Sequence, residues 1–411
     1  MRLQSEVDVV VIGAGAAGIA AARRLHRHGR SVLVVEAMDR LGGRAHTVVL
    51  GGCPFDLGCG WLHSADRNPL ARLAETGGVP LDRSEAAWGV QLRNLGFSAA
   101  DQRAAGETYA VFEERAHRAP PPSDCAGELL ARDDPWRAFA DGLSGYMNGA
   151  ELDRLSVRDF LAYDDAATEN NWRVPSGYGA LIAGAADGLD IALGTRVSAI
   201  DHGGRTVRVE TDRGAVQARA AIVTVSTSVL AVGAMRFTPA PDDHLHAAAG
   251  LPLGLADKLF LRMADAEAVP PESHLLGDPH SSRTGSYYLR PFGRPVIECF
   301  FGGIGARTLE EAGPGAAEAL AREELGRLLG ADFATGLTSL AATAWGREPT
   351  VLGSYSHALP GRADARAVLA APPSERLVFA GEACSPHDFS TAHGAWASGL
   401  RAADLIEVTL G

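Results

Sequence analysis

An α/β fold is predicted by three features of this 411-residue chain. A glycine-rich turn follows an apolar run near the N-terminus, a second one follows an apolar run near the C-terminus, and helix-forming segments come after both. Apolar runs without alternation are typical of parallel strands that are covered on both faces. The length, with 46% hydrophobic residues and 48 glycines, suffices for two domains. We therefore expect a Rossmann-like domain joined to a second domain.

The N-terminal unit has the pattern strand, glycine-rich turn, helix, strand. Val7–Ile12 form the near-continuous apolar run that a strand buried on both faces needs. The turn "GAGAAG" then fits GxGxxG. Gly13 permits the tight turn, Gly15 lets a diphosphate approach the backbone, and Gly18 lets helix and strand pack closely. The helix that begins here directs its N-terminal amides at the phosphates.

An acidic residue follows the second expected strand, Ser31–Val35. Glu36 stands where a dinucleotide-binding unit places the carboxylate that binds a ribose. A carboxylate suits a free 2′-hydroxyl, so FAD or NAD is favoured over NADP. The alternative, a tight turn in an unrelated α/β unit, leaves Glu36 unexplained.

The segment after Glu36 favours a flavin. Arg40, Gly43 and Arg44 belong to a second glycine-rich turn, whose guanidinium groups are able to meet phosphate oxygens. This segment, "EAMDRLGGRAHTV", resembles the stretch after the ribose-binding acid in the flavin-dependent amine oxidase superfamily. "DLGCGWLHSADRNPL" resembles the flavin-contacting loop of its polyamine oxidases, so contacts from Gly60 to FAD are implied.

The C-terminal unit, "RLVFAGEACSPHDFSTAHGAWASGLRAADLI", reads as strand, turn and a helix of small residues from about Ala392. It resembles the closing motif of the same family. The resemblance implies that Glu382 binds the FAD chain and that Thr391 and Ala392 lie against the isoalloxazine. Leu193–Asp201 and Ala221–Leu230 are expected to be strands that resemble the family's middle FAD segment.

The resemblance implies a discontinuous architecture of the amine oxidase, or GR2-type flavoprotein, kind. We expect a Rossmann-like FAD-binding domain of residues 1–77, 191–237 and 351–411, and an α+β substrate-binding domain of residues 78–190 and 238–350. The residues expected to bind the cofactor are Gly13, Gly15, Ala16, Gly18, Glu36, Arg40, Gly43, Arg44, Gly60, Trp61, Val197, Gly381, Glu382, Thr391 and Ala392.

The segment "GLADKLFLRM" contains Lys258, the only lysine beside 37 arginines. Taken alone, the segment also fits the polar face of a half-buried or edge strand. A lone lysine indicates chemistry that a guanidinium cannot perform, because an ammonium changes its protonation state more readily. The family carries a lysine here that holds a water near flavin N5, and the resemblance implies that catalytic role for Lys258.

The segment "WGREPTVLGSYSHALPG" resembles the family's pre-flavin motif. The resemblance implies that Trp345 and Tyr355 are walls beside the flavin, where aromatic rings hold an amine by shape and cation–π attraction. Ordinary core aromatics are the alternative. Ser354 stands where monoamine oxidases carry the cysteine that bonds the flavin, so FAD is expected to bind non-covalently. Thr391 replaces their second cage tyrosine, which predicts a roomier pocket.

His63 matches a polyamine-oxidase histidine that faces the substrate amine; a surface histidine is the alternative. Trp61 stands where L-amino-acid oxidases place a carboxylate-binding arginine, and an indole cannot form that bidentate pair. An L-amino-acid oxidase would need another arginine, such as Arg93. The acidic segment Tyr163–Asn171 is able to attract distal amines, although a solvated loop is favoured.

Composition limits the partners. A net charge of −12 disfavours nucleic acid. Five cysteines, an odd number without a CxxC pair, predict reduced thiols in a cytoplasm and neither disulfides nor a metal site. The apolar run at Val7 is broken by glycines and lacks a basic leader, so neither a signal peptide nor a membrane span is expected. The expected partners are a small amine and O2, with the chain a monomer or homodimer.

The function expected from the resemblance is oxidation of a primary or secondary amine, a polyamine or a monoamine. Hydride passes to flavin N5, oxygen is reduced to hydrogen peroxide, and the imine is hydrolysed. Three alternatives stay open at this point: an L-amino-acid oxidase, a flavin dehydrogenase or desaturase with another electron acceptor, and a scaffold whose FAD is structural.

Overall fold

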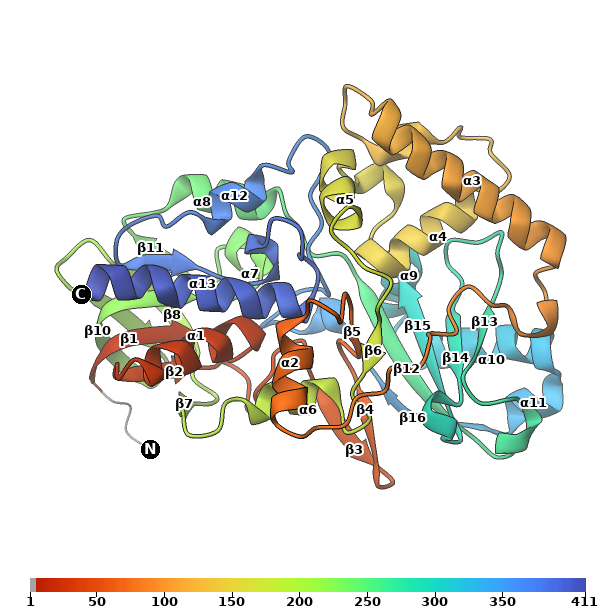
Figure 1. The fold of residues 1–411 in the computed structure, drawn as a ribbon, viewed down its shortest axis with the longest axis horizontal. Helices are drawn as coiled ribbons and strands as arrows, with labels where there is room; N and C mark the ends of the chain where they lie inside the picture. Colours follow the sequence, from red (N-terminus) through yellow and green to blue (C-terminus); the bar gives the residue numbers. More distant parts are fainter. Residues whose placement is uncertain (1–4) are drawn as a thin grey trace.

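Two β-sheets organise the chain, and Figure 1 places them at the two ends of the long axis. The computed structural model describes residues 5–411. The first sheet has the order β11-β8-β9-β10-β1-β2-β7, with β17 also paired to β10. Its strands are β1 (Glu6–Ile12), β2 (Val32–Val35), β7 (Asp190–Ala192), β8 (Val197–Asp201), β9 (Val207–Thr211), β10 (Gly214–Val223), β11 (Arg236–Thr238) and β17 (Leu377–Phe379).

The centre of the first sheet is parallel and covered on both faces. Strand β1 pairs in parallel with β2 and β10, and β10 pairs in parallel with β17. Val9 and Val11 pack in one core cluster with the helices α1 (Ala16–Arg27) and α13 (Ala392–Leu410). Val10 packs in a second cluster on the opposite face, beside three short helices. Burial on both faces explains why β1 lacks polar alternation.

Three short helices cover that opposite face: α7 (Thr227–Ala231), α8 (Asp242–Ala249) and α12 (Ala365–Ala370). The strand predicted for Ala221–Leu230 is therefore wrong in its second half, because β10 ends at Val223. The hydroxyl of Ser226 accepts a hydrogen bond from Val229 N at 3.2 Å and caps α7. A serine N-cap favours a helix over the extended conformation that the apolar residues suggested.

The second sheet is antiparallel, with the order β13-β14-β15-β12-β16. Its strands are β12 (Ala256–Met263), β13 (Ser273–Leu276), β14 (Ser286–Leu289), β15 (Val296–Gly302) and β16 (Leu337–Ala342). Alternate residues such as Leu259, Leu261 and Ile297 pack in a core cluster with residues of α9 (Gly303–Ala312) and α10 (Ala316–Leu329). The other face carries Lys258 and Glu298, which both line a cavity.

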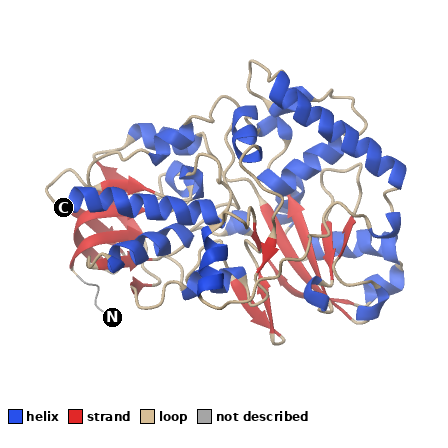
Figure 2. Cartoon of the chain, in the orientation of Figure 1, coloured by secondary structure: helices blue, strands red, loops and turns tan. Residues whose placement is uncertain are grey.

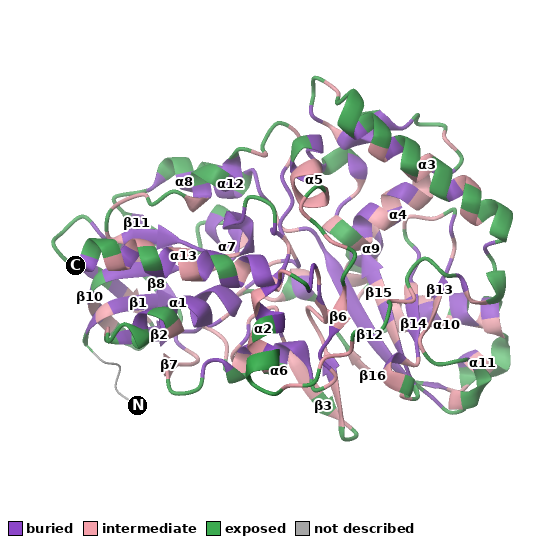
Figure 3. Ribbon diagram, viewed as in Figure 1, coloured by how far each residue is buried: buried purple, intermediate pink, exposed green. Residues whose placement is uncertain are grey.

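The remaining helices are α2 (Pro69–Thr76), α3 (Ala99–Arg118), α4 (Arg137–Asn148), α5 (Val157–Asp164), α6 (Tyr178–Gly184) and α11 (Ala331–Thr335), and the short strands are β3 (Thr47–Leu50), β4 (Cys53–Asp56), β5 (Trp61–Leu62) and β6 (Trp172–Arg173). Figure 2 separates the helices and strands by colour, and in Figure 3 the strands of both sheets are mostly buried. The predicted α/β fold with a parallel sheet is confirmed. The domain boundaries stay a prediction. Within residues 5–411, no helix is both long and apolar enough to cross a membrane.

Candidate active site

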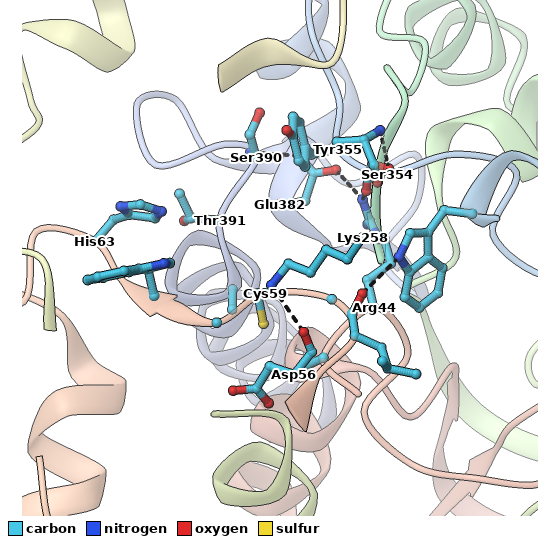
Figure 4. A pocket seen from close by; sticks show the side chains of 18 of the residues that line it. Arg44, Asp56, Cys59, His63, Lys258, Ser354, Tyr355, Glu382, Ser390 and Thr391 are labelled. Atoms are coloured by element: carbon cyan, nitrogen blue, oxygen red, sulfur yellow. Dashed lines mark hydrogen bonds and ion pairs between the residues drawn. The ribbon is translucent and has the colours of Figure 1, made fainter. Parts of the chain in front are cut away.

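A cavity of about 1000 Å³ extends from the glycine-rich turn after β1 to the inner face of the second sheet. Figure 4 shows part of its lining. The cavity brings together almost all of the predicted site residues, from segments far apart in the sequence. Those that line it are Gly13, Gly15, Ala16, Glu36, Gly43, Arg44, Gly60, Trp61, His63, Val197, Lys258, Trp345, Tyr355, Gly381, Glu382, Thr391 and Ala392.

The turn between β1 and α1 has the geometry that a diphosphate needs. Gly13 has a φ of 104°, and a Cβ there would lie 2.5 Å from Thr224 Oγ1. A Cβ on Gly18 would lie 1.9 Å from Gly13 O, so a side chain there would separate the helix from the turn. At Gly15 the nearest atom to an added Cβ is Gly42 O, at 3.8 Å, which leaves the backbone open to a ligand. The residues present therefore fit a dinucleotide.

Two predicted cofactor residues have roles within the protein itself. Glu36 accepts hydrogen bonds from Ala14 N at 2.6 Å and Met38 N at 2.8 Å, which hold its carboxylate at the cavity edge. Arg40 donates to Gly43 O at 2.8 Å and so braces the second glycine-rich turn. Within the described chain, Arg40 and Gly18 lie outside the cavity lining. Their contact with a cofactor stays a prediction.

Glu382 is buried at the C-terminal side of the cavity and is fully hydrogen-bonded. Arg44 Nη1 donates to Oε1 at 2.9 Å, and Ser356 Oγ and Ser390 N donate to Oε2 at 2.6 and 2.9 Å. Burial acts to raise the pKa of Glu382, but Arg44 and Arg366 outweigh it and hold that pKa below its ordinary value. The carboxylate is therefore ionised near neutral pH.

Arg366 and Asp159 form a second buried ion pair close to Glu382. Arg366, on α12, donates to both carboxylate oxygens of Asp159 at 2.6 and 2.8 Å and to Ser356 Oγ at 3.0 Å. Its guanidinium carbon lies 3.5 Å from the centroid of the Phe389 ring. Charges of alternating sign, Arg44, Glu382, Arg366 and Asp159, thus join α5 to the cofactor end of the cavity.

Lys258 lies on β12, an interior strand of the second sheet, between β15 and β16. Its side chain is 8% exposed, so the interpretation as a polar-face or edge residue is wrong. Nζ donates to Asp56 O at 3.0 Å and forms an ion pair with Glu298 Oε1 at 2.7 Å. A Cβ on Gly60 would lie 3.3 Å from Nζ, so the loop after β4 passes directly over the ammonium (Figure 4).

The predicted aromatic walls are held by hydrogen bonds, and Trp345 is buried whereas Tyr355 is half-buried. Trp345 Nε1 donates to Leu57 O at 3.2 Å, and the Tyr355 hydroxyl donates to Tyr146 O. Burial raises the pKa of Tyr355 well above its ordinary value, so the phenol stays neutral. Ser354, between these walls in sequence, donates to Ala256 O at 2.7 Å and accepts from Ala256 N at 2.8 Å. Its hydroxyl is therefore engaged with β12.

Thr391 and His63 face the cavity with defined partners. Thr391 caps α13, because its Oγ1 accepts from Gly394 N at 3.0 Å and donates to Asp388 O at 2.6 Å. His63 Nδ1 lies 2.7 Å from Asn171 Oδ1. Burial lowers the pKa of His63 below its ordinary value, which leaves the imidazole neutral near pH 7.

Several lining residues were not predicted from the sequence. Arg173 lies 5.0 Å from the ring centroid of Trp61 and pairs with Asp82 at 2.5 Å and Glu272 at 2.8 Å. Glu298 completes the ion pair with Lys258. The acidic segment also reaches the cavity, where its lining members are Tyr163, Asp164, Ala167, Thr168, Glu169 and Asn171. The prediction of a solvated loop therefore describes this segment only in part, because these residues line the cavity.

Comparison with known proteins assigns the family. A family profile described as "Flavin containing amine oxidoreductase" matches residues 16–161 and 107–407. Polyamine oxidase 4 of Oryza sativa subsp. japonica is 32% identical, over 97% of this chain and 88% of its own length. Lysine-specific histone demethylase 1 homolog 3 of the same plant is 29% identical, over 97% of this chain and 54% of its own length.

The structure of a putrescine oxidase bound to putrescine superposes with a TM-score of 0.79, at 19% identity and over 98% of this chain and 99% of that one. That likeness confirms the fold. The profile and the plant relatives confirm the predicted superfamily, the enzyme class and FAD as the cofactor. The chain therefore belongs to the flavin containing amine oxidoreductases, an amine-acting flavoenzyme with non-covalently bound FAD.

Proposed function

We propose that this enzyme oxidises a polyamine or a monoamine that carries a primary or secondary amino group, with oxygen as the electron acceptor. The observation that carries the proposal is that the acidic segment contributes Asp164 and Glu169 to the lining of the cavity. Carboxylates attract a cationic chain, and the attraction is stronger inside a cavity because the dielectric constant there is lower than in bulk water. The plant relatives named as polyamine oxidases support the same substrate class.

Bound FAD supplies the hydride acceptor at N5. The protein's part is to hold the amine and its α-carbon in one orientation. Trp345 and Tyr355 restrict the α-carbon by shape, and their ring faces favour a cation. His63 is neutral and is able to accept a hydrogen bond from the amine. Lys258 holds a water beside the reacting atoms, and the hydrolysis of the imine uses water from the same cavity.

We also propose which residues contact the cofactor. The turn at Gly13–Gly18 and Arg44 take the diphosphate, Glu36 takes the adenosine ribose, and Val197 lies near the adenine. The N-terminus of α13, with Thr391 and Ala392, faces the flavin pyrimidine, because helix N-terminal amides favour electron-rich atoms. Release of hydrogen peroxide, a cytoplasmic location and a monomeric or homodimeric state belong to this proposal.

An L-amino-acid oxidase is disfavoured by the arginines. Arg173 is the guanidinium beside Trp61, and two carboxylates already occupy it, at 2.5 and 2.8 Å. Arg93 lies outside the cavity lining of the described residues. A substrate carboxylate would have to displace one of the two carboxylates that already pair with Arg173.

The proposal is tested by anaerobic mixing of the holoenzyme with monoamines, polyamines and amino acids while the flavin absorbance is recorded. We expect polyamines or monoamines to bleach the flavin and amino acids to leave it oxidised. Admission of oxygen should restore the colour and release hydrogen peroxide. Bleaching by amino acids alone would support an amino-acid oxidase, and turnover only with an artificial acceptor would support a dehydrogenase. A flavin that no amine reduces would indicate a structural cofactor.

Acid precipitation should release all of the yellow colour into the supernatant. Ser354 offers no thiol for a thioether, and both hydrogen-bonding capacities of its hydroxyl are used by Ala256. The absorbance of pellet and supernatant at the flavin maximum measures the result. The variant Ser354→Cys is the matched comparison, since it places a thiol at the same position. Colour retained in the wild-type pellet would contradict the prediction.

A further inference from the structure

The lysine of this site has a carboxylate partner on the next strand. Lys258 is on β12 and Glu298 on β15, and their charged groups meet at 2.7 Å on the face of the sheet that lines the cavity. The side chains are 8% and 25% exposed. The ammonium is buried and the carboxylate half-buried, so the pair is screened less than a pair on the surface.

The geometry of the ammonium leaves one direction open. An ammonium carries three N–H donors. The Lys258 group donates one of them to Asp56 O at 3.0 Å, and its Nζ lies 2.7 Å from Glu298 Oε1 in an ion pair. Because the backbone carbonyl and the carboxylate hold the ammonium from two positions, the direction of its remaining N–H donors is restricted. Without Glu298, the ammonium would rotate about the bond to Asp56 and lose that direction.

The carboxylate also balances a charge that would oppose the substrate. A buried ammonium without a partner repels the cationic amine that this cavity is proposed to take. Within residues 5–411, Lys258 is the cation that pairs with Glu298. The pair is neutral as a whole, so Lys258 offers a hydrogen-bond donor at the cavity without presenting a net positive charge to an approaching amine.

We propose that Glu298 is a positioning residue, which acts on the reaction through Lys258 by fixing the direction of its free N–H donor. The inference rests on the proposed role of Lys258 in holding a water. It assigns to Glu298 no direct contact with the amine. Its effect on the flavin therefore depends on the presence of the lysine ammonium.

A double-mutant cycle tests this dependence without any amine. The holoenzymes of wild type, Glu298→Gln, Lys258→Met and the double variant are reduced with dithionite and mixed with oxygen, and flavin reoxidation is followed. We expect Glu298→Gln to slow reoxidation by roughly threefold to tenfold when Lys258 is present, and by less than about twofold in the Lys258→Met background. The absorption spectrum of the resting flavin should shift in the first comparison only.

Equal slowing in both backgrounds, or no change of rate and spectrum in either, would overturn the proposal. An amine titration distinguishes the positioning role from direct binding of the substrate. If Glu298 contacted the amine, its replacement by glutamine would weaken amine binding in both backgrounds. Since reoxidation needs no amine, failure of the proposed substrate class leaves the cycle readable. Glu318→Gln is the control variant, because it removes a carboxylate from a different ion pair, the one with Arg322 on α10. Should Glu298→Gln fail to retain FAD, Glu298→Asp, which shortens the side chain and keeps the charge, supplies the same comparison.

Discussion

Replacement of Lys258 with methionine is expected to slow flavin reduction or reoxidation by at least about tenfold, or about 1.4 kcal/mol of activation free energy, while FAD stays bound. Methionine keeps much of the length and the apolar stem of lysine but removes all the N–H donors. The water held for the reaction loses its partner, and Glu298 is left without its cation. Anaerobic and aerobic stopped-flow absorbance measure the two half-reactions separately.

The matched control for Lys258→Met lies on the same strand. Arg262→Met also removes a cation from β12, but Arg262 is exposed and lies outside the described cavity lining. Both half-reactions of this variant are expected to keep wild-type rates. Rates of Lys258→Met that match the wild type in both half-reactions would return the lysine to a structural role in the sheet.

The variant Arg366→Met is expected to lower the free energy of unfolding by about 3–5 kcal/mol and to weaken FAD binding. Asp159 would lose both donors of a bidentate pair whose side chains are 3% and 7% exposed. A buried carboxylate without its cation is costly. Glu382 would lose part of the positive charge that keeps it ionised against burial. Chemical denaturation of holoenzyme and apoenzyme, with titration of FAD, measures both effects.

A neighbouring arginine provides the comparison. Arg158, on α5, is half exposed and pairs with the largely exposed Asp364 at 3.3 Å and more distantly with Asp124 at 3.8 Å. Removal of its charge in Arg158→Met should change the free energy of unfolding by no more than about 1 kcal/mol, because exposed pairs are screened by water. Equal losses in Arg158→Met and Arg366→Met would show that the buried network contributes nothing beyond an ordinary surface pair.

The parts predicted well from the sequence are those whose signals are local. The turn after β1, the carboxylate of Glu36 and the start of α13 at Ala392 each depend on a few consecutive residues. The partners of the site residues could not be predicted in this way. Glu298 pairs with Lys258 through the registration of two strands, and Asn171 reaches His63 from 108 positions away. Such pairings follow from tertiary packing, which sequence spacing does not encode.

Local signals also competed with one another. The apolar residues of Ala221–Leu230 indicated one strand, yet the hydroxyl of Ser226 begins a helix inside that range. Thr391 was assigned only to the flavin pocket, although its hydroxyl also caps α13. The identity of a residue in the sequence does not reveal that its side chain has two roles, so the structure is needed to see both roles.

The alternating charges of Arg44, Glu382, Arg366 and Asp159 also bear on the order in which the protein matures. Arg44 and Asp159 are synthesised before their partners Glu382 and Arg366. Until α12 and Glu382 emerge, the nascent chain holds one partner of each ion pair, and neither pair is complete. The growing polypeptide therefore depends on its own apolar strands, and not on these charges, to persist until then.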